Sequence, residues 1–147
     1  MKSFLFVLAA LGAGLASFYV LDFLRVKSMR ALTSRLGFQF TDSPLPASFT
    51  MTCYPFDGNL ATVWNLIEGQ LKGTSVLVFD CTVWGNYRTF IAVQKEGDPF
   101  VREGKLSTGW ILQSNGWTAV YEYGFGNFLP WTMSVQRIED YFKNLRI

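Results

Sequence analysis

The hydrophobic pattern divides the chain into one long apolar segment and a longer region in which polar and apolar residues alternate. Ser3 to Leu21 is a run of 19 uncharged, mostly apolar residues. As a helix with a rise of about 1.5 Å per residue it is about 28 Å long, close to the thickness of a bilayer core. The helical pattern continues to Leu36, and Gly37 is a predicted stop. We predict an anchor helix with a basic juxtamembrane extension over 1–36 and a β-rich domain over 37–147.

A cleaved secretory signal is the alternative interpretation of this segment. Lys2 supplies a positive start, and Gly14-Leu15-Ala16 resembles a small-residue cleavage site. Apolar residues nevertheless continue past that site to Leu21, and a basic cluster follows. This order is typical of a stop-transfer sequence, so the pattern favours an uncleaved anchor.

Alternation and turn residues predict six to seven short antiparallel strands after the anchor. Lys72-Gly73, Gly85-Asn86 and Asn115-Gly116 are predicted hairpin turns. The predicted strands cover 38–40, 62–71, 74–84, 87–95, 109–113 and 117–123.

The last segment, 134–146, has apolar residues at helical spacing, with Ser134 as the predicted N-cap. An amphipathic helix there is expected to cover the sheet. The fold class is therefore α+β: one N-terminal transmembrane helix, a mainly antiparallel β domain and a C-terminal amphipathic helix. A β-meander closed by such a helix is reminiscent of pleckstrin-homology-like barrels, an architectural analogy that implies no function.

The basic residues are concentrated beside the anchor. Between 25 and 35 there are four basic residues and no acidic ones, whereas 38–147 holds eight basic and ten acidic residues. Basic residues beside a membrane segment stay cytoplasmic, which predicts a domain in the cytoplasm and an N-terminus outside. We expect the four to lie at the membrane surface near anionic lipid headgroups, and we expect no nucleic-acid partner. These residues are Arg25, Lys27, Arg30 and Arg35.

The chain contains no histidine, which removes the commonest general base and the commonest metal ligand. Phosphate-binding glycine motifs and the GxSxG motif are also absent. Cys53 and Cys81 have no zinc-site spacing, and two free buried thiols are favoured over a disulfide. We therefore predict no enzyme activity, no catalytic residue, no cofactor and no metal.

Asp80 is the most interesting carboxylate, because strand alternation places it on the same sheet face as Val76 and Val78. A buried carboxylate can serve as an acid or base. A structural partner such as Arg88 or a backbone amide explains it more simply, and we favour that interpretation.

Three short motifs resemble an uncharacterised bacterial family whose members often carry an N-terminal membrane segment. They are Leu36-Gly37-Phe38-Gln39-Phe40, Asn65-Leu66-Ile67-Glu68-Gly69 and Val76-Leu77-Val78-Phe79-Asp80. The family pattern has an aromatic residue where this chain has Cys81. The resemblance implies a fold and no mechanism. From the anchor and its basic flank, we expect a location in the bacterial inner (cytoplasmic) membrane.

Two sets of residues are candidate contacts with other proteins. Small residues four apart in the apolar run let a second helix approach closely. Large apolar side chains in the segment 124–133 suit an adhesive patch. The predicted helix-packing residues are Ala9, Gly12, Ala13 and Ala16, and the predicted partner-contact residues are Phe125, Phe128, Leu129 and Trp131.

The function we expect is that of a non-catalytic accessory or scaffold subunit in a larger membrane complex, with integral membrane subunits as partners. Energy-transducing complexes, photosynthetic or respiratory, commonly carry small single-helix subunits, although nothing in the sequence selects one. The alternative is a membrane-tethered module that binds a small apolar or lipid-like ligand in a β-barrel mouth lined by residues such as Trp84, Trp110 and Tyr121.

Overall fold

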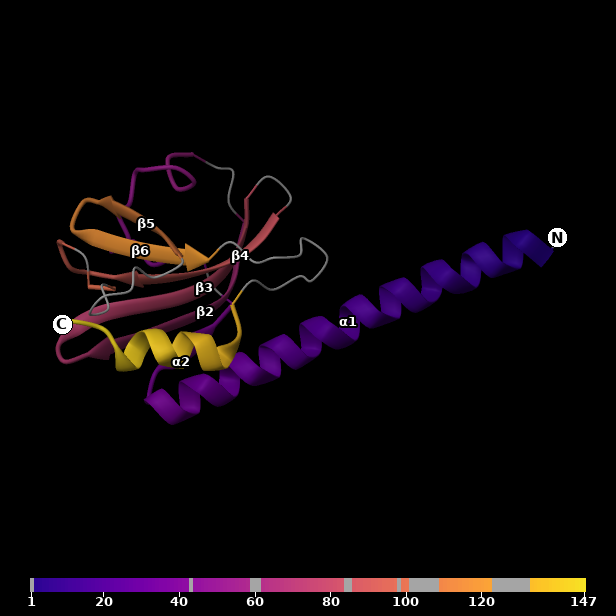
Figure 1. The fold of residues 1–147 in the computed structure, drawn as a ribbon, viewed down its shortest axis with the longest axis horizontal. Coiled ribbons are helices and arrows are strands. Elements are labelled where there is room, and N and C mark those ends of the chain that lie inside the picture. The colour runs from indigo at the N-terminus through magenta and orange to yellow at the C-terminus, as the bar shows by residue number, and fades with distance from the viewer. Residues whose placement is uncertain are drawn as a thin grey trace.

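The computed structural model has the expected α+β fold, with a long N-terminal helix, one six-stranded antiparallel sheet and a short C-terminal helix (Figure 1). The structure describes residues 2–42, 44–58, 62–83, 86–97, 99–100, 109–122 and 133–147. The helices are α1 (Lys2–Leu36) and α2 (Val135–Lys143). The strands are β1 (Gln39–Thr41), β2 (Thr62–Leu71), β3 (Thr74–Val83), β4 (Asn86–Val93), β5 (Gly109–Ser114) and β6 (Trp117–Glu122).

The end of α1 is fixed by Gly37, as predicted. Gly37 has φ +69°, and the Phe38 amide donates a hydrogen bond of 3.0 Å to the Thr33 carbonyl. This is the Schellman arrangement, in which a glycine adopts the left-handed conformation just after the helix. The chain thereby turns directly from α1 into β1, which brings the end of α1 against the sheet.

Two of the three predicted hairpin turns are confirmed. Of the third, Gly85 lies outside the described residues and Asn86 lies in a strand. Asn115 and Gly116 both have positive φ, as do Lys72 and Gly73, which is what a type I′ turn requires. Asn86, predicted to lie in a turn, instead pairs with Val83 as the first residue of β4.

The strand order is β1-β2-β3-β4-β6-β5, so the sheet is not the simple meander that we expected. The hairpin of β5 and β6 joins the sheet through β6, which pairs with β4, and β5 forms an edge. The described strands form one sheet, with β1 and β5 at its two edges. The likeness to a pleckstrin-homology-like barrel stays a prediction.

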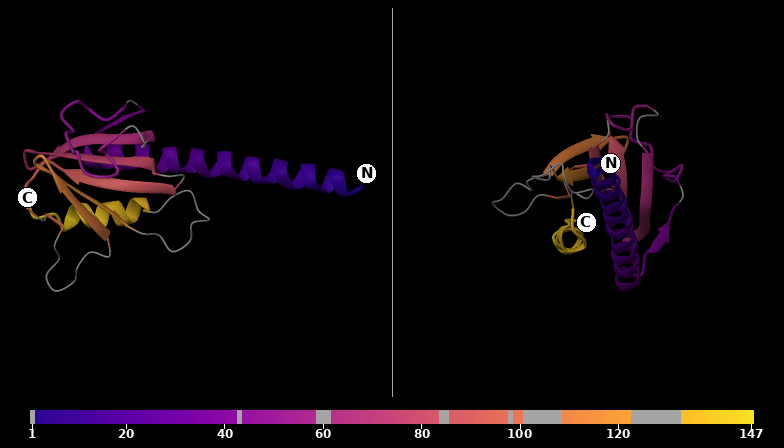
Figure 2. Two further views of the ribbon diagram at one scale, coloured as in Figure 1. Left: turned by 90° about the horizontal axis from the view of Figure 1, so that it is seen from above. Right: turned by 90° about the vertical axis from the view of Figure 1, so that its right-hand side faces the viewer.

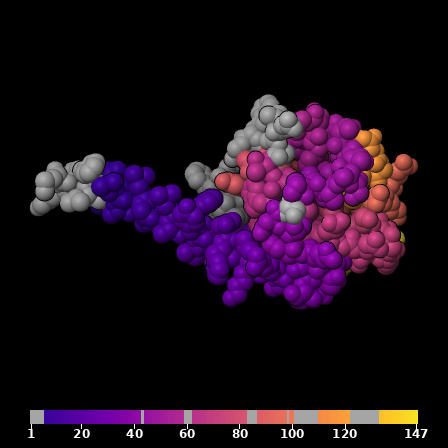
Figure 3. Space-filling view, turned by 180° about the vertical axis from the view of Figure 1, so that it is seen from behind, coloured from indigo at the N-terminus to yellow at the C-terminus, as the bar shows by residue number. Residues whose placement is uncertain are grey.

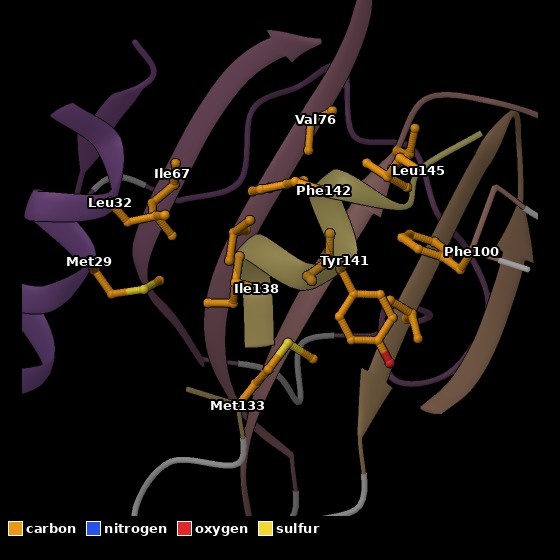
Figure 4. Packing of buried hydrophobic residues seen from close by; sticks show 14 residues of the cluster. Met29, Leu32, Ile67, Val76, Phe100, Met133, Ile138, Tyr141, Phe142 and Leu145 are labelled. Atoms are coloured by element: carbon orange, nitrogen blue, oxygen red, sulfur yellow. The ribbon is translucent and has the colours of Figure 1, made fainter. Parts of the chain in front are cut away.

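One face of the sheet is covered by both helices (Figures 2 and 4). Met29 and Leu32 of α1 are fully buried there beside Ile67, and Ile138 of α2 is fully buried as well. Ser134 caps α2 as predicted, because its side chain accepts a hydrogen bond from the Arg137 amide. The predicted role of the C-terminal helix as a cover for the sheet is confirmed.

The opposite face of the sheet is covered by the segment 44–58. Phe49 and Phe56 of this segment pack with their ring centroids 5.8 Å and 5.9 Å from that of Phe79. Trp117 is 2% exposed on this face, and its indole N–H donates to the Ser48 carbonyl at 3.0 Å. The sheet is therefore packed on both sides.

The helix α1 belongs to two environments along its length (Figure 3). Its N-terminal part projects from the domain with large apolar side chains exposed, among them Leu15 at 63% and Tyr19 at 72%. Its C-terminal part lies in the domain core through Met29 and Leu32. The core of the domain therefore includes side chains from the last turns of α1, on the anchor side of the predicted boundary at residue 36.

The stretch Phe6–Leu36 is long and apolar enough to cross a membrane, a property that signal sequences near an N-terminus share.

Candidate functional site at the junction of α1 and the sheet

Asp80 lies on the sheet face that strand alternation predicted. Val76 and Val78 belong to the core beneath the two helices, while Phe79 and Cys81 belong to the core on the other face. Asp80 is 4% exposed, so a carboxylate is buried in an apolar layer. Such a group is tolerated only when it is paired and hydrogen-bonded.

The partner of Asp80 is Arg25, and the predicted pairing with Arg88 is wrong. Arg88 pairs across the strands with Cys81, so its side chain leaves the sheet on the opposite face, where its guanidinium donates to the Tyr87 carbonyl at 2.9 Å. Arg25 reaches Asp80 from α1, 55 residues away in sequence.

Arg25 and Asp80 form a bidentate ion pair. Arg25 Nε donates to Asp80 Oδ2 at 3.0 Å and Arg25 Nη2 donates to Oδ1 at 2.8 Å. Their side chains are 5% and 6% exposed. Planar guanidinium and carboxylate groups fit each other in this geometry, which fixes their relative orientation as well as their distance.

Three further groups complete the hydrogen bonding of the pair. Asp80 also accepts from Thr89 Oγ1 at 2.7 Å and from Asn65 Nδ2 at 3.0 Å. Arg25 also donates from Nη1 to the Met133 carbonyl at 2.9 Å, just before α2, and from Nη2 to Thr89 Oγ1 at 3.0 Å. One network thus joins α1, three strands and the entry to α2. We call Arg25, Asn65, Asp80 and Thr89 the junction cluster.

A β-bulge in β2 directs Asn65 into the junction cluster. Trp64 pairs with Asp80 and Ile67 pairs with Val78, so Asn65 and Leu66 together lie opposite Phe79 alone. Asn65 has φ +50°, a left-handed conformation that asparagine tolerates better than most residues. The strained residue therefore serves to turn an amide toward the buried carboxylate.

Two substitutions separate the contributions of Asn65. Asn65→Gly keeps the backbone but loses the amide, and it should lower the free energy of unfolding by about 1.5 to 3 kcal/mol. Asn65→Ala loses the same amide but keeps a Cβ in the left-handed region, so it should be about 1 kcal/mol less stable than Asn65→Gly. Denaturant unfolding followed by tryptophan fluorescence measures both. Equal stability of the two variants would show that the bulge conformation imposes no strain.

The structure places the four predicted membrane-surface residues in different surroundings. Arg25 is buried in the domain, so its expected contact with lipid headgroups is wrong. Lys27 and Arg30 are exposed, with the Arg30 guanidinium 5.1 Å from the Phe40 ring centroid. Arg35 forms an ion pair of 2.9 Å with Glu139 of α2. A headgroup contact of Lys27, Arg30 and Arg35 stays a prediction.

The predicted helix-packing residues Ala9, Gly12, Ala13 and Ala16 are all exposed on α1. The predicted partner-contact residues Phe125, Phe128, Leu129 and Trp131 lie outside the described residues. So does Trp84, whereas Trp110 is described and is 60% exposed.

Both cysteines are free thiols, Cys53 partly buried and Cys81 fully buried. Burial, together with the neighbouring charge of Asp80, raises the pKa of the Cys81 thiol to about 12. Burial is also the main reason that the pKa of Cys53 is raised. Both groups are therefore neutral thiols near pH 7, and neither has the thiolate character of a nucleophile.

The carboxylate of the junction cluster is fully hydrogen-bonded. Both Asp80 oxygens accept two hydrogen bonds each, and the cluster is closed to solvent. Within the described ranges, no group of three acidic or cysteine side chains could hold a metal ion. The arrangement fixes the position of α1 relative to the sheet.

A signal for Arg25 was present in the sequence. Arg25, Met29, Leu32 and Leu36 recur at helical spacing, which places the arginine on the same helix face as three apolar residues. Charge alone groups Arg25 with the neighbouring basic residues, whereas the apolar spacing identifies it as a residue that faces the domain.

Fold and site together define an α+β domain that is clamped directly onto an apolar N-terminal helix. No protein-family model, curated protein or solved structure matches the chain.

Proposed function

We propose that this protein is a non-catalytic accessory or scaffold subunit of a larger membrane protein complex. The observation that carries the proposal is the junction cluster, which joins the apolar helix to the domain without a flexible linker. A simple tether needs no such joint, because a mobile linker is sufficient to keep a domain near a membrane. A scaffold does need one, since it must hold its domain in a fixed orientation beside its partners.

The exposed part of α1 supports a membrane location for that helix. Large apolar side chains are exposed from Phe6 at 76% to Leu24 at 49%, over a length that matches a bilayer core. The helix continues without a break through the small residues 14–16, which favours an anchor over a cleaved signal. Lys27, Arg30 and Arg35 follow the apolar run and favour a cytoplasmic domain in the bacterial inner membrane, with the N-terminus outside.

The orientation of the small-residue face of α1 supports a contact with a second membrane helix. At about 100° per residue, Arg25, Met29 and Phe18 lie on one side of α1, which is the side that contacts the domain. The predicted helix-packing residues lie on the opposite side of the same helix. A second membrane helix therefore has room to approach them without meeting the domain.

The alternative, a module that binds a small apolar ligand, has less support. It needs a continuous apolar cavity, whereas both faces of the sheet carry packed clusters of buried side chains. The hollow beside the turn of β5 and β6 is lined mainly by polar or small groups, among them Glu96, Gln113 and Asn115. A lining by Trp84, Trp110 and Tyr121 stays a prediction.

The proposal is tested by adding bulk to the small-residue face. Gly12→Leu combined with Ala16→Leu should keep the chain in the membrane and reduce the amount of co-purifying membrane subunits about tenfold, a loss of about 1.4 kcal/mol of association. The measurement is extraction in a mild detergent, followed by native sizing and mass analysis of the partners.

The matched control adds bulk to the opposite side of the same helix. Leu11→Phe combined with Leu15→Phe should leave the native mass unchanged. Migration of the unmodified chain solely as a free monomer would contradict the proposal. Equal losses from the two double variants would show that the small residues have no special role.

A further inference from the structure

One end of the sheet lies alongside α1 beyond the junction cluster, where it contacts the apolar part of the helix. Tyr87 pairs with Thr82, two residues along β3 from Asp80, so its side chain lies on the face that meets α1. Its ring centroid is 6.4 Å from that of Phe18. Trp64, which pairs directly with Asp80, has its ring 5.5 Å from Tyr87 in an edge-to-face contact. We call Trp64 and Tyr87 the aromatic corner.

The aromatic corner lies at a defined depth along α1. Phe18 precedes the end of the apolar run at Leu21 by three residues, or about 4.5 Å along a helix. If the run from Ser3 to Leu21 crosses the bilayer core, Phe18 lies just inside the boundary between acyl chains and headgroups. A side chain that packs against Phe18 must therefore lie in or next to that boundary.

The chemistry of the corner fits this layer. Tryptophan and tyrosine combine an apolar ring with a polar N–H or O–H, and both are enriched where acyl chains meet headgroups. Trp64 and Tyr87 are each half-buried, so part of each ring remains open to the surroundings. Tyr19, next to Phe18 on α1, is 72% exposed and lies at nearly the same depth along the helix.

We propose that the aromatic corner is a lipid-binding surface that inserts into the interfacial layer of the bilayer and fixes the domain against the membrane. This inference rests on the membrane anchoring in the proposed function. The sheet end would then contact the bilayer at a second point beside α1, and two points limit the rotation and tilt of the domain more than one helix can. The occupant is lipid, because the surface is continuous with the exposed apolar side of a helix of spanning length.

The test uses the full chain in vesicles of phosphatidylcholine and phosphatidylglycerol with brominated acyl chains, which quench nearby tryptophan. The emission lost in Trp64→Phe relative to the unmodified chain is the contribution of Trp64. We expect this contribution to be quenched more by bromine close to the headgroup than by bromine near the chain ends. In the control Trp117→Phe, the lost emission should be insensitive to bromine, because Trp117 lies toward the other end of the sheet. Its neighbour Thr118 pairs with Val93, which pairs with Val76, four residues along β3 from Asp80.

A second reporter guards against misfolding of the first variant. Tyr87→Trp in the Trp64→Phe background moves the indole to the residue that contacts Phe18, and it should show the same dependence on bromine depth.

Two results would overturn the inference, and they can be distinguished. An alkaline carbonate wash tests whether the chain is integrated in the bilayer. If the chain stays in the vesicles while neither Trp64 nor the tryptophan of Tyr87→Trp is quenched, the corner faces water or a protein and only this inference fails. If carbonate releases the chain, the membrane anchoring of the proposed function fails as well.

Discussion

Asp80→Asn is expected to lower the free energy of unfolding of the domain by about 3 to 5 kcal/mol, the range typical of removing one partner from a buried ion pair. The substitution preserves the shape of the side chain but removes its charge. Arg25 then remains buried at 6% exposure without a counter-ion, and an amide N–H₂ group replaces one of the two oxygens that accept from the guanidinium. The loss should come from an unpaired charge and not from a cavity.

The measurement is denaturant unfolding of the full chain in detergent, followed by the fluorescence of the tryptophans, of which Trp117 lies in the core. Asp42→Asn is the matched control, since it makes the same chemical change at an exposed position and should shift stability by less than about 0.5 kcal/mol. An equal effect of the two substitutions would mean that the pair at Asp80 contributes no more than a surface charge.

Removing residues 1–36 is expected to prevent the domain from folding, whereas removing residues 1–21 should leave it folded. The larger deletion takes away the fully buried Met29 and Leu32 and leaves Asp80 without Arg25. Core truncations cost about 2 to 5 kcal/mol each, and the bidentate ion pair with its hydrogen bonds is lost as well. Together these losses match the whole stability of a typical domain, about 5 to 15 kcal/mol.

The two truncated chains differ only in the segment 22–36, so their comparison isolates the contribution of that part of α1. The chain that begins at Asp22 should unfold cooperatively in denaturant. The chain that begins at Gly37 should lack a cooperative transition and expose Asp80 and Ile67 to solvent. Cooperative unfolding of the shorter chain would show that the sheet and α2 are a complete domain without the anchor helix.

Local pattern was enough to predict most of the elements. Alternation located β2 from Thr62 to Leu71, and Asn115-Gly116 located a hairpin, because side-chain periodicity and positive φ are properties of a few adjacent residues. Gly37 marks the end of α1 by its positive φ, and Ser134 marks the start of α2 as its N-cap, both of which are also local properties. The order of strands could not be read in this way, because the pairing of β6 with β4 depends on the path of the chain between β4 and β5.

The site was only half predictable. Alternation gave the face of Asp80 and hence its burial, but its partner lies 55 residues away on a different kind of element. Charge grouping placed Arg25 at the membrane surface, and proximity in sequence suggested Arg88 for Asp80. Both inferences failed because a strand sends neighbouring side chains to opposite faces, while a helix brings together residues three and four apart. The bulge at Asn65 has only a weak signal in the sequence: asparagine is depleted in strands and tolerates positive φ, but one such residue does not define the pairing register.

Arg25 and Asp80 join the anchor helix to the domain through a direct interaction. The most direct test is the double-mutant cycle of Arg25→Met and Asp80→Asn, measured by denaturant unfolding. We predict that the double variant is more stable than the sum of the two single losses implies, by about 1 to 3 kcal/mol, because neither buried charge is left behind. Losses that add to within about 0.5 kcal/mol would contradict the claim, since additivity is the behaviour of sites that do not interact.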